Sequence, residues 1–143
     1  RLYRDQELLD FAKHHGDTEV QHLALIEDWL GPSARSRLLG PWRLAGWVTG
    51  ALPALFGRRF VYATIAAVET FVDQHYQQQI DYLQQFAVPA GLLPLLERCQ
   101  ADEKDHRDEA AQLLTRPPSW ILCLWCAIVG RGSAAAVVVA RRI

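Results

Sequence analysis

The sequence has no methionine, few cysteines and no excess of positive charge. A complete translated chain begins with methionine, so the arginine at position 1 leads us to expect a partial chain. The 15 basic and 16 acidic residues give a net charge of -1, and this argues against a nucleic-acid-binding protein, which usually carries a clear basic excess. Hydrophobic residues make up 50% and charged residues 22% of the 143 residues. This composition is that of a globular chain, and the length suits one domain over residues 1–143.

The three cysteines do not make a closed set of disulfides, because their number is odd. Cys123 and Cys126 form a Cys-x-x-Cys motif, but a zinc ribbon needs a second such pair and a redox motif needs strands nearby. No segment shows the polar and apolar alternation that is typical of a strand. We therefore interpret these two cysteines as small buried apolar residues and predict an all-α fold.

Apolar residues recur with a helical period along most of the chain. We predict helices over residues 2–12, 18–30, 58–86 and 94–114. Residues 14–17 predict a break, because Gly16 can end one helix while Asp17 or Thr18 can cap the next. Val20 and Leu23 are expected on the apolar side of the second helix.

Two further segments, residues 38–56 and 119–143, are strongly apolar. The first contains three glycines and two prolines and the second is interrupted by Arg131, so neither resembles an unbroken spanning helix of about 20 apolar residues. They either complete the bundle core or lie on a membrane surface, and their length favours the membrane. The aromatic rings expected at the level of the lipid headgroups are those of Trp42, Trp47, Trp120 and Trp125.

A Glu-x-x-His motif occurs twice, as Glu19 with His22 and as Glu103 with His106. Residues three apart on a helix differ by about 60° around the axis and about 4.5 Å along it, so both side chains can reach one metal ion. One copy is a weak signal, because both residue types are common on helix surfaces. Two copies on separate helices are a stronger one, and Glu69 lies between them among apolar neighbours that suggest an inward orientation.

Four-helix bundles with this pattern build a carboxylate-bridged dinuclear metal site from two single glutamates and two Glu-x-x-His motifs. Imidazole and carboxylate ligands together suit iron or manganese, and oxygen chemistry favours iron. The alternative is that these residues are solvated or form salt bridges. The scheme needs a fourth glutamate, and Glu7 is the only one ahead of Glu19.

With these motifs, the chain resembles the demethoxyubiquinone hydroxylase family, the diiron monooxygenases of ubiquinone biosynthesis. The resemblance covers nearly the whole chain. The stretches that carry it are Leu2–Gln6, His22–Leu25, Pro41–Gly46, Leu55–Gly57, Ala67–Glu69 with Gln74–Tyr76 and Gln79, and Asp102–Glu109.

The resemblance implies a ferritin-like four-helix bundle with additional apolar, membrane-facing helices and a first helix truncated at the N-terminus. The ligands that it implies for two iron ions are Glu19, His22, Glu69, Glu103 and His106. It also implies that His75 and Tyr76 lie close to the metal, and Asp102 is a candidate to accept a proton from a ligand histidine. The first-helix glutamate of the family lies shortly before the stretch matched by Leu2, so we expect it upstream of Arg1 rather than at Glu7.

The reaction implied by the resemblance is hydroxylation of the benzoquinone ring of demethoxyubiquinone by dioxygen at a reduced diiron centre. The implied partners are a polyprenyl benzoquinone, dioxygen, a membrane surface and, in some organisms, an accessory lipid-binding protein, without nucleic acid. The implied location is the cytoplasmic face of a bacterial membrane or the matrix side of the mitochondrial inner membrane. Two alternatives stay open: another ferritin-like diiron protein that reduces peroxide or handles iron, and a non-catalytic membrane-associated bundle if the gene truly lacks the first-helix glutamate.

Overall fold

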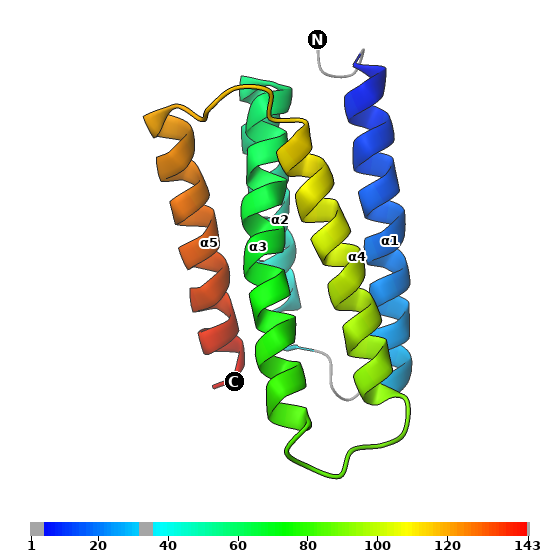
Figure 1. Ribbon diagram of the computed structural model, residues 1–143. Coiled ribbons are helices and arrows are strands. Elements are labelled where there is room, and N and C mark those ends of the chain that lie inside the picture. Colours follow the sequence, from blue (N-terminus) through cyan, green and yellow to red (C-terminus); the bar gives the residue numbers. More distant parts are fainter. Residues whose placement is uncertain (1–4, 32–35, 143) are drawn as a thin grey trace.

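A computed structural model describes residues 5–31 and 36–142, and in these ranges the chain forms five α-helices and no strand (Figure 1). They are α1 Gln6–Leu30, α2 Leu39–Phe56, α3 Arg58–Leu83, α4 Leu92–Gln112 and α5 Trp120–Ala140. The predicted all-α, ferritin-like helical architecture is confirmed. The predictions that fall on residues 1–4, 32–35 and 143 lie outside the described residues.

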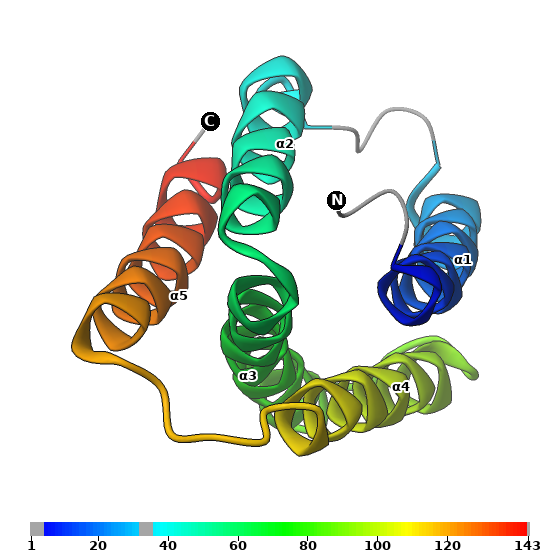
Figure 2. The same cartoon turned by 90° about the horizontal axis from the view of Figure 1, so that it is seen from above.

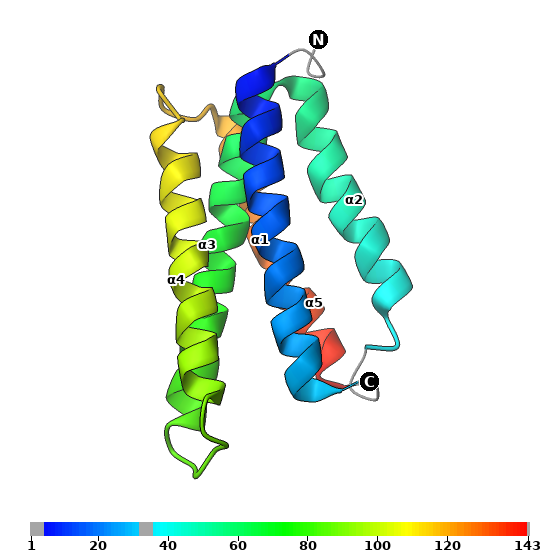
Figure 3. The ribbon, with the colours of Figure 1, turned by 90° about the vertical axis from the view of Figure 1, so that its right-hand side faces the viewer.

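Helix α3 is the central element, since it packs against α2, α4 and α5, while α1 packs against α4. In Figure 2, which views the bundle from above, α2, α4 and α5 lie on different sides of α3. Figure 3 shows α1 in front, with α4 on one side of it and α2 on the other. Helix α4 runs antiparallel to both α1 and α3, and the middle turns of the three helices lie at about the same level of the bundle (Figure 1).

Helix α1 is continuous, so the predicted break at residues 14–17 is wrong. The helix begins after Asp5, whose carboxylate accepts a hydrogen bond from the Leu8 N–H, and it ends at Gly31, which has a φ of 71°. Gly16 lies in its interior, where a glycine costs about 1 kcal/mol relative to alanine. Burying a side chain such as Phe11 contributes about 1.5–3 kcal/mol, so tertiary packing outweighs the local preference of the glycine.

The polar residues of the predicted break support the helix instead of ending it. Lys13 forms an ion pair with Asp17 one turn later. The Thr18 hydroxyl donates to the His14 carbonyl oxygen at 3.3 Å, so it bonds within the helix and caps nothing.

The buried side of α1 also differs from the expectation. Its buried residues are Leu8, Phe11, His15 and His22. Val20 and Leu23, predicted to face the core, are 68% and 59% exposed. The reason is that α1 turns the side that carries His15 and His22 toward α4, and Val20 and Leu23 lie outside this side of the helix.

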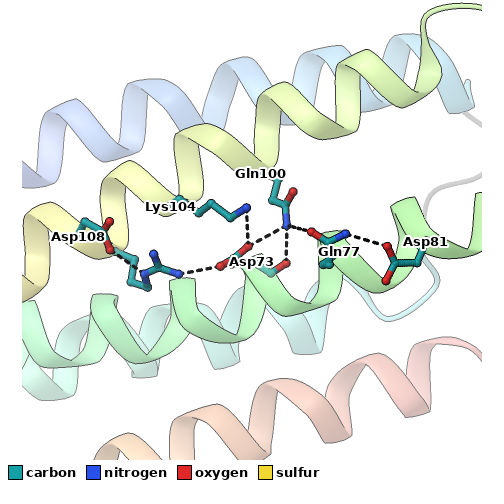
Figure 4. Close-up of polar contacts among 7 residues, drawn as sticks. Asp73, Gln77, Asp81, Gln100, Lys104 and Asp108 are labelled. Carbon is teal, nitrogen blue, oxygen red and sulfur yellow. Dashed lines mark hydrogen bonds and ion pairs between the residues drawn. The ribbon is translucent and has the colours of Figure 1, made fainter. Parts of the chain in front are cut away.

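A polar network joins α3 and α4 and is centred on Asp73 (Figure 4). The Asp73 carboxylate is contacted by Gln100 Nε2 at 2.8 Å, Arg107 Nη1 at 2.7 Å and Lys104 Nζ at 3.5 Å. Asp73 lies one turn after Glu69, and Gln100 lies one turn before Glu103. The network therefore stabilises the helix register that places these two glutamates opposite each other.

Helices α2 and α5 carry the apolar segments. Trp47 and Trp120 are 70% and 74% exposed. Trp42 is half-buried, and Trp125 turns inward, where its indole N–H donates to the Thr64 hydroxyl of α3 at 2.8 Å. Trp125 is half-buried and its polar edge is satisfied within the bundle, so a membrane-facing role for this ring stays a prediction. Among the described helices, α5 alone has the length and apolar composition to cross a membrane, which by itself is weak evidence.

The cysteines are free, and their environments differ. Cys99 is fully buried, Cys126 is half-buried and Cys123 is exposed. The predicted burial of the Cys-x-x-Cys pair is therefore wrong for Cys123, which lies on the outer side of α5.

Candidate metal centre

Three glutamates and one histidine from three helices meet inside the bundle. They are Glu19 of α1, Glu69 of α3, and Glu103 and His106 of α4. One ligand atom from each residue can be chosen so that all four atoms lie within 4.8 Å of one another. Glu19 is exposed and the other three residues are buried. The structure thus brings together four of the five residues expected to hold metal.

The fifth residue, His22, lies beside this cluster. Its Nδ1 is 3.1 Å from Glu103 Oε1, while Glu103 Oε2 is 3.6 Å from His106 Nδ1. The Glu103 carboxylate therefore turns one oxygen toward each histidine, which suits a carboxylate that bridges two ions. On its other side, His22 Nε2 lies 3.0 Å from Asp102 Oδ2, and such a carboxylate contact fixes the orientation of a ligand imidazole.

The close approach of the carboxylates perturbs their protonation. Burial, reinforced by the charge and hydrogen bond of Glu103, raises the pKa of Glu69 to about 9. The pKa of Glu19 is also raised, by desolvation of its carboxylate and by the charge of Glu103, although the residue as a whole is exposed. Burial alone would raise the pKa of Glu103, but the neighbouring His106, Glu69 and His22 outweigh it and lower that pKa. The nearby carboxylate of Glu103 raises the pKa of His106.

These residues fit a bound metal. Glu103 Oε2 and His106 Nδ1 are buried and have no hydrogen-bond partner, although they lie only 3.6 Å apart. A cation at this place would satisfy both atoms and would offset the charge of Glu103, which adds to the effect of burial in raising the pKa of Glu69. Three carboxylates with two imidazoles are the ligand types expected for iron or manganese.

His75 and Tyr76 occupy different sides of α3. Burial, followed by the neighbouring Cys99 and Glu103, raises the pKa of Tyr76, so its ring faces α4 close to the cluster. His75 stacks on Phe71 with ring centroids 5.8 Å apart, and its Nε2 lies 3.0 Å from Gln79 Nε2. None of these contacts of His75 involves the cluster, and a role for it near the metal stays a prediction.

Sequence reasoning missed His15 and Glu109. His15 is buried, its Nε2 lies 3.1 Å from Glu109 Oε2, and its ring stacks on that of His106. The available signal was spacing, because His15 precedes Glu19 by four residues and so shares its side of one helix. The predicted helix break at residues 14–17 placed His15 outside the helix of Glu19, so this spacing was not considered. Glu7, considered as a fourth glutamate, lies away from the cluster and pairs with Arg58 at 2.9 Å.

An apolar cavity of about 600 Å³ between α1, α2 and α3 adjoins the cluster. Apolar residues make up most of its lining, and Glu19, Glu69 and His15 are its polar side chains. A second cavity of about 750 Å³, between α2, α3 and α5, shares Gly50 and Ile65 with the first. The cluster therefore faces a space that suits a largely apolar molecule.

Residues 1–140 match the family model described as "Ubiquinone biosynthesis protein COQ7". The curated protein "3-demethoxyubiquinol 3-hydroxylase" of Rhodospirillum rubrum is 35% identical over 98 residues, which are 67% of this chain. The match covers 45% of that relative, so it spans about half of the relative's length. No solved structure matches the chain significantly.

Proposed function

Because the chain belongs to the ubiquinone biosynthesis protein COQ7 family, we propose that it provides the diiron centre of a monooxygenase that hydroxylates the ring of demethoxyubiquinone or its quinol. The observation that carries the proposal is the buried cluster of glutamates and histidine beside an apolar cavity. The cavity favours this function over peroxide reduction or iron storage, which need no large apolar binding site.

In this proposal, five residues would hold two iron ions: Glu19, His22, Glu69, Glu103 and His106. The iron pair supplies the activation of dioxygen and the transfer of oxygen to the ring. Glu103 lies between the two histidines and would contribute its carboxylate to the metal, while Asp102 contacts His22 and would hold its ring in place. The protein would thus orient these ligands before metal binds.

The apolar cavity would hold the quinone ring next to the metal. Glu19 and Glu69 line the cavity and belong to the metal cluster, so a ring in the cavity lies against the ligands. The other lining residues are mostly apolar, such as Leu8, Phe11 and Ile65, and they exclude water from the ring. They also provide the surface against which the first units of a polyprenyl tail can pack.

The rest of such a tail stays in a bilayer, so the protein must meet the membrane surface. Helices α2 and α5 expose the apolar side chains needed for this contact, including Leu55, Trp47 and Trp120. Arg131 in the middle of α5 favours an interfacial position over a span, because an unpaired charge is costly at the bilayer centre.

The test is a hydroxylation assay with the full-length protein, loaded anaerobically with Fe²⁺ and supplied with a reductant, a short-tailed demethoxyubiquinol and ¹⁸O₂. We expect the product ring to carry one ¹⁸O atom, as measured by mass spectrometry. Glu103→Gln should abolish the product, and Glu97→Gln, a change of an exposed glutamate on the same helix, should preserve it. A product without the label, or equal activity of the Glu103 variant, contradicts the proposal.

A further inference from the structure

The two Glu-x-x-His halves of the cluster differ in what holds their histidine. His22 contacts the Asp102 carboxylate at 3.0 Å, and Asp102 directly precedes Glu103. The residue that directly precedes Glu19 is Thr18, which has no carboxylate and donates its hydroxyl within α1. Asp102 of α4 contacts His22 of α1, but α1 has no carboxylate at the corresponding position before Glu19 that could contact His106.

His106 packs instead against the ring of His15. The two ring centroids are 4.0 Å apart and the ring planes are inclined by 21°, which is a stacked arrangement. Both residues are buried, at 6% exposure for His15 and 3% for His106. A stacked ring blocks rotation of His106 out of its plane, just as a hydrogen bond restrains His22.

His15 is itself held on two sides. Its Nε2 lies 3.1 Å from Glu109 Oε2, and Glu109 follows His106 by three residues, on the same side of α4. On its other side the His15 ring meets Phe11, with centroids 4.0 Å apart. The ring of His15 is therefore enclosed between Phe11 and His106 and anchored at its edge.

We propose that His15 is a positioning residue, which holds the ring of His106 in the orientation that binds metal. The inference rests on the metal centre proposed above and adds a residue that is not itself a ligand. Partners that orient a ligand histidine contribute about 10- to 100-fold in metal affinity. His15 should therefore affect the metal position that uses His106 and leave the position that uses His22 unchanged.

The test is a titration of the metal-free full chain with Co²⁺, followed through the visible absorption of the bound ion. The Co²⁺ binding event that is lost in His106→Gln is called the His106 step, and the event that is lost in His22→Gln is called the His22 step. His15→Leu removes the flat ring but keeps an apolar side chain, and we expect it to weaken the His106 step by about 10-fold or more. His15→Phe keeps a flat ring and should stay within about threefold of the wild type.

The matched control is Glu97→Gln, which changes an exposed glutamate of α4 and should leave both steps unchanged. Equal effects of His15→Leu and His15→Phe, or an equal loss at both steps, would overturn the role of His15. If His15→Leu does not fold, as judged by circular dichroism, Glu109→Ala replaces it. This change removes the carboxylate that contacts His15 Nε2, and Glu109 is exposed to solvent. An unchanged His106 step in Glu109→Ala then overturns the inference.

The same titration separates this inference from the proposed function. A wild-type chain that takes up no Co²⁺, or an unchanged titration of Glu103→Gln, contradicts the metal centre itself, and the role of His15 falls with it. Normal wild-type binding that Glu103→Gln abolishes and the His15 variants do not alter contradicts the role of His15 alone.

Discussion

Glu69 is expected to destabilise the metal-free protein at neutral pH. Its carboxylate is buried, at 5% exposure, and its pKa rises from 4.5 to about 9 in the folded state. The folded chain therefore binds this proton more tightly than the unfolded chain does. The resulting stabilisation is complete below pH 4.5 and is lost as the pH rises from there to about 9. At 1.36 kcal/mol per pH unit, the free energy of unfolding falls by about 3 kcal/mol between pH 4.5 and pH 7.

Glu69→Gln keeps the shape of the side chain and removes its titration. We expect this variant to raise the free energy of unfolding of the metal-free protein by about 3 kcal/mol at pH 7 and to leave it nearly unchanged at pH 4.5. The assay is urea unfolding followed by circular dichroism, with a chelator present. Glu97→Gln, on the exposed side of α4, should change stability by no more than about 0.5 kcal/mol at either pH. Equal stability of Glu69→Gln and wild type at pH 7, or the same gain at both pH values, would show that the Glu69 carboxyl does not titrate with a raised pKa.

Two further predictions concern α1 and the membrane-facing surface. Gly16→Ala should raise the free energy of unfolding by about 0.5–1 kcal/mol in the same urea assay, because Gly16 lies inside a continuous helix and no atom lies within 4 Å of an added Cβ. A loss of stability would indicate that the helix is broken there. Trp47→Ala combined with Trp120→Ala should weaken binding to anionic lipid vesicles by about 10-fold or more in a sedimentation assay, because both rings are largely exposed. Trp29→Ala, which removes an exposed ring from α1, is the control, and equal binding of the double variant and the control would contradict membrane docking through α2 and α5.

The arrangement of the cluster was largely predictable, because helix geometry is local. Glu103 and His106 lie three residues apart, and this spacing alone turns both side chains toward one place. The apolar neighbours of Glu69 likewise indicated its inward orientation before the structure showed its burial. Such inferences need only the period of a helix and no knowledge of its partner.

The features that sequence reasoning missed depend on contacts between helices. Gly16 predicted a break because its local preference is against a helix, while the packing that overrides it comes from the other helices. The position of the His15 ring depends on its contacts with Glu109 and His106, which lie more than 90 residues away in the chain. Trp125 turns inward because Thr64 of α3 offers an acceptor for its indole N–H. No period or motif within one segment contains this information.

We propose that the cluster around Glu103 is a metal centre, and a measurement of bound iron decides this. The full-length protein would be loaded anaerobically with Fe²⁺, freed of excess metal, and analysed for iron per chain by inductively coupled plasma mass spectrometry. We expect bound iron in the wild type and in Glu97→Gln, and its loss in Glu103→Gln, whose carboxylate lies between the two histidines. Equal iron content in Glu103→Gln and the wild type would show that the cluster is not the iron site.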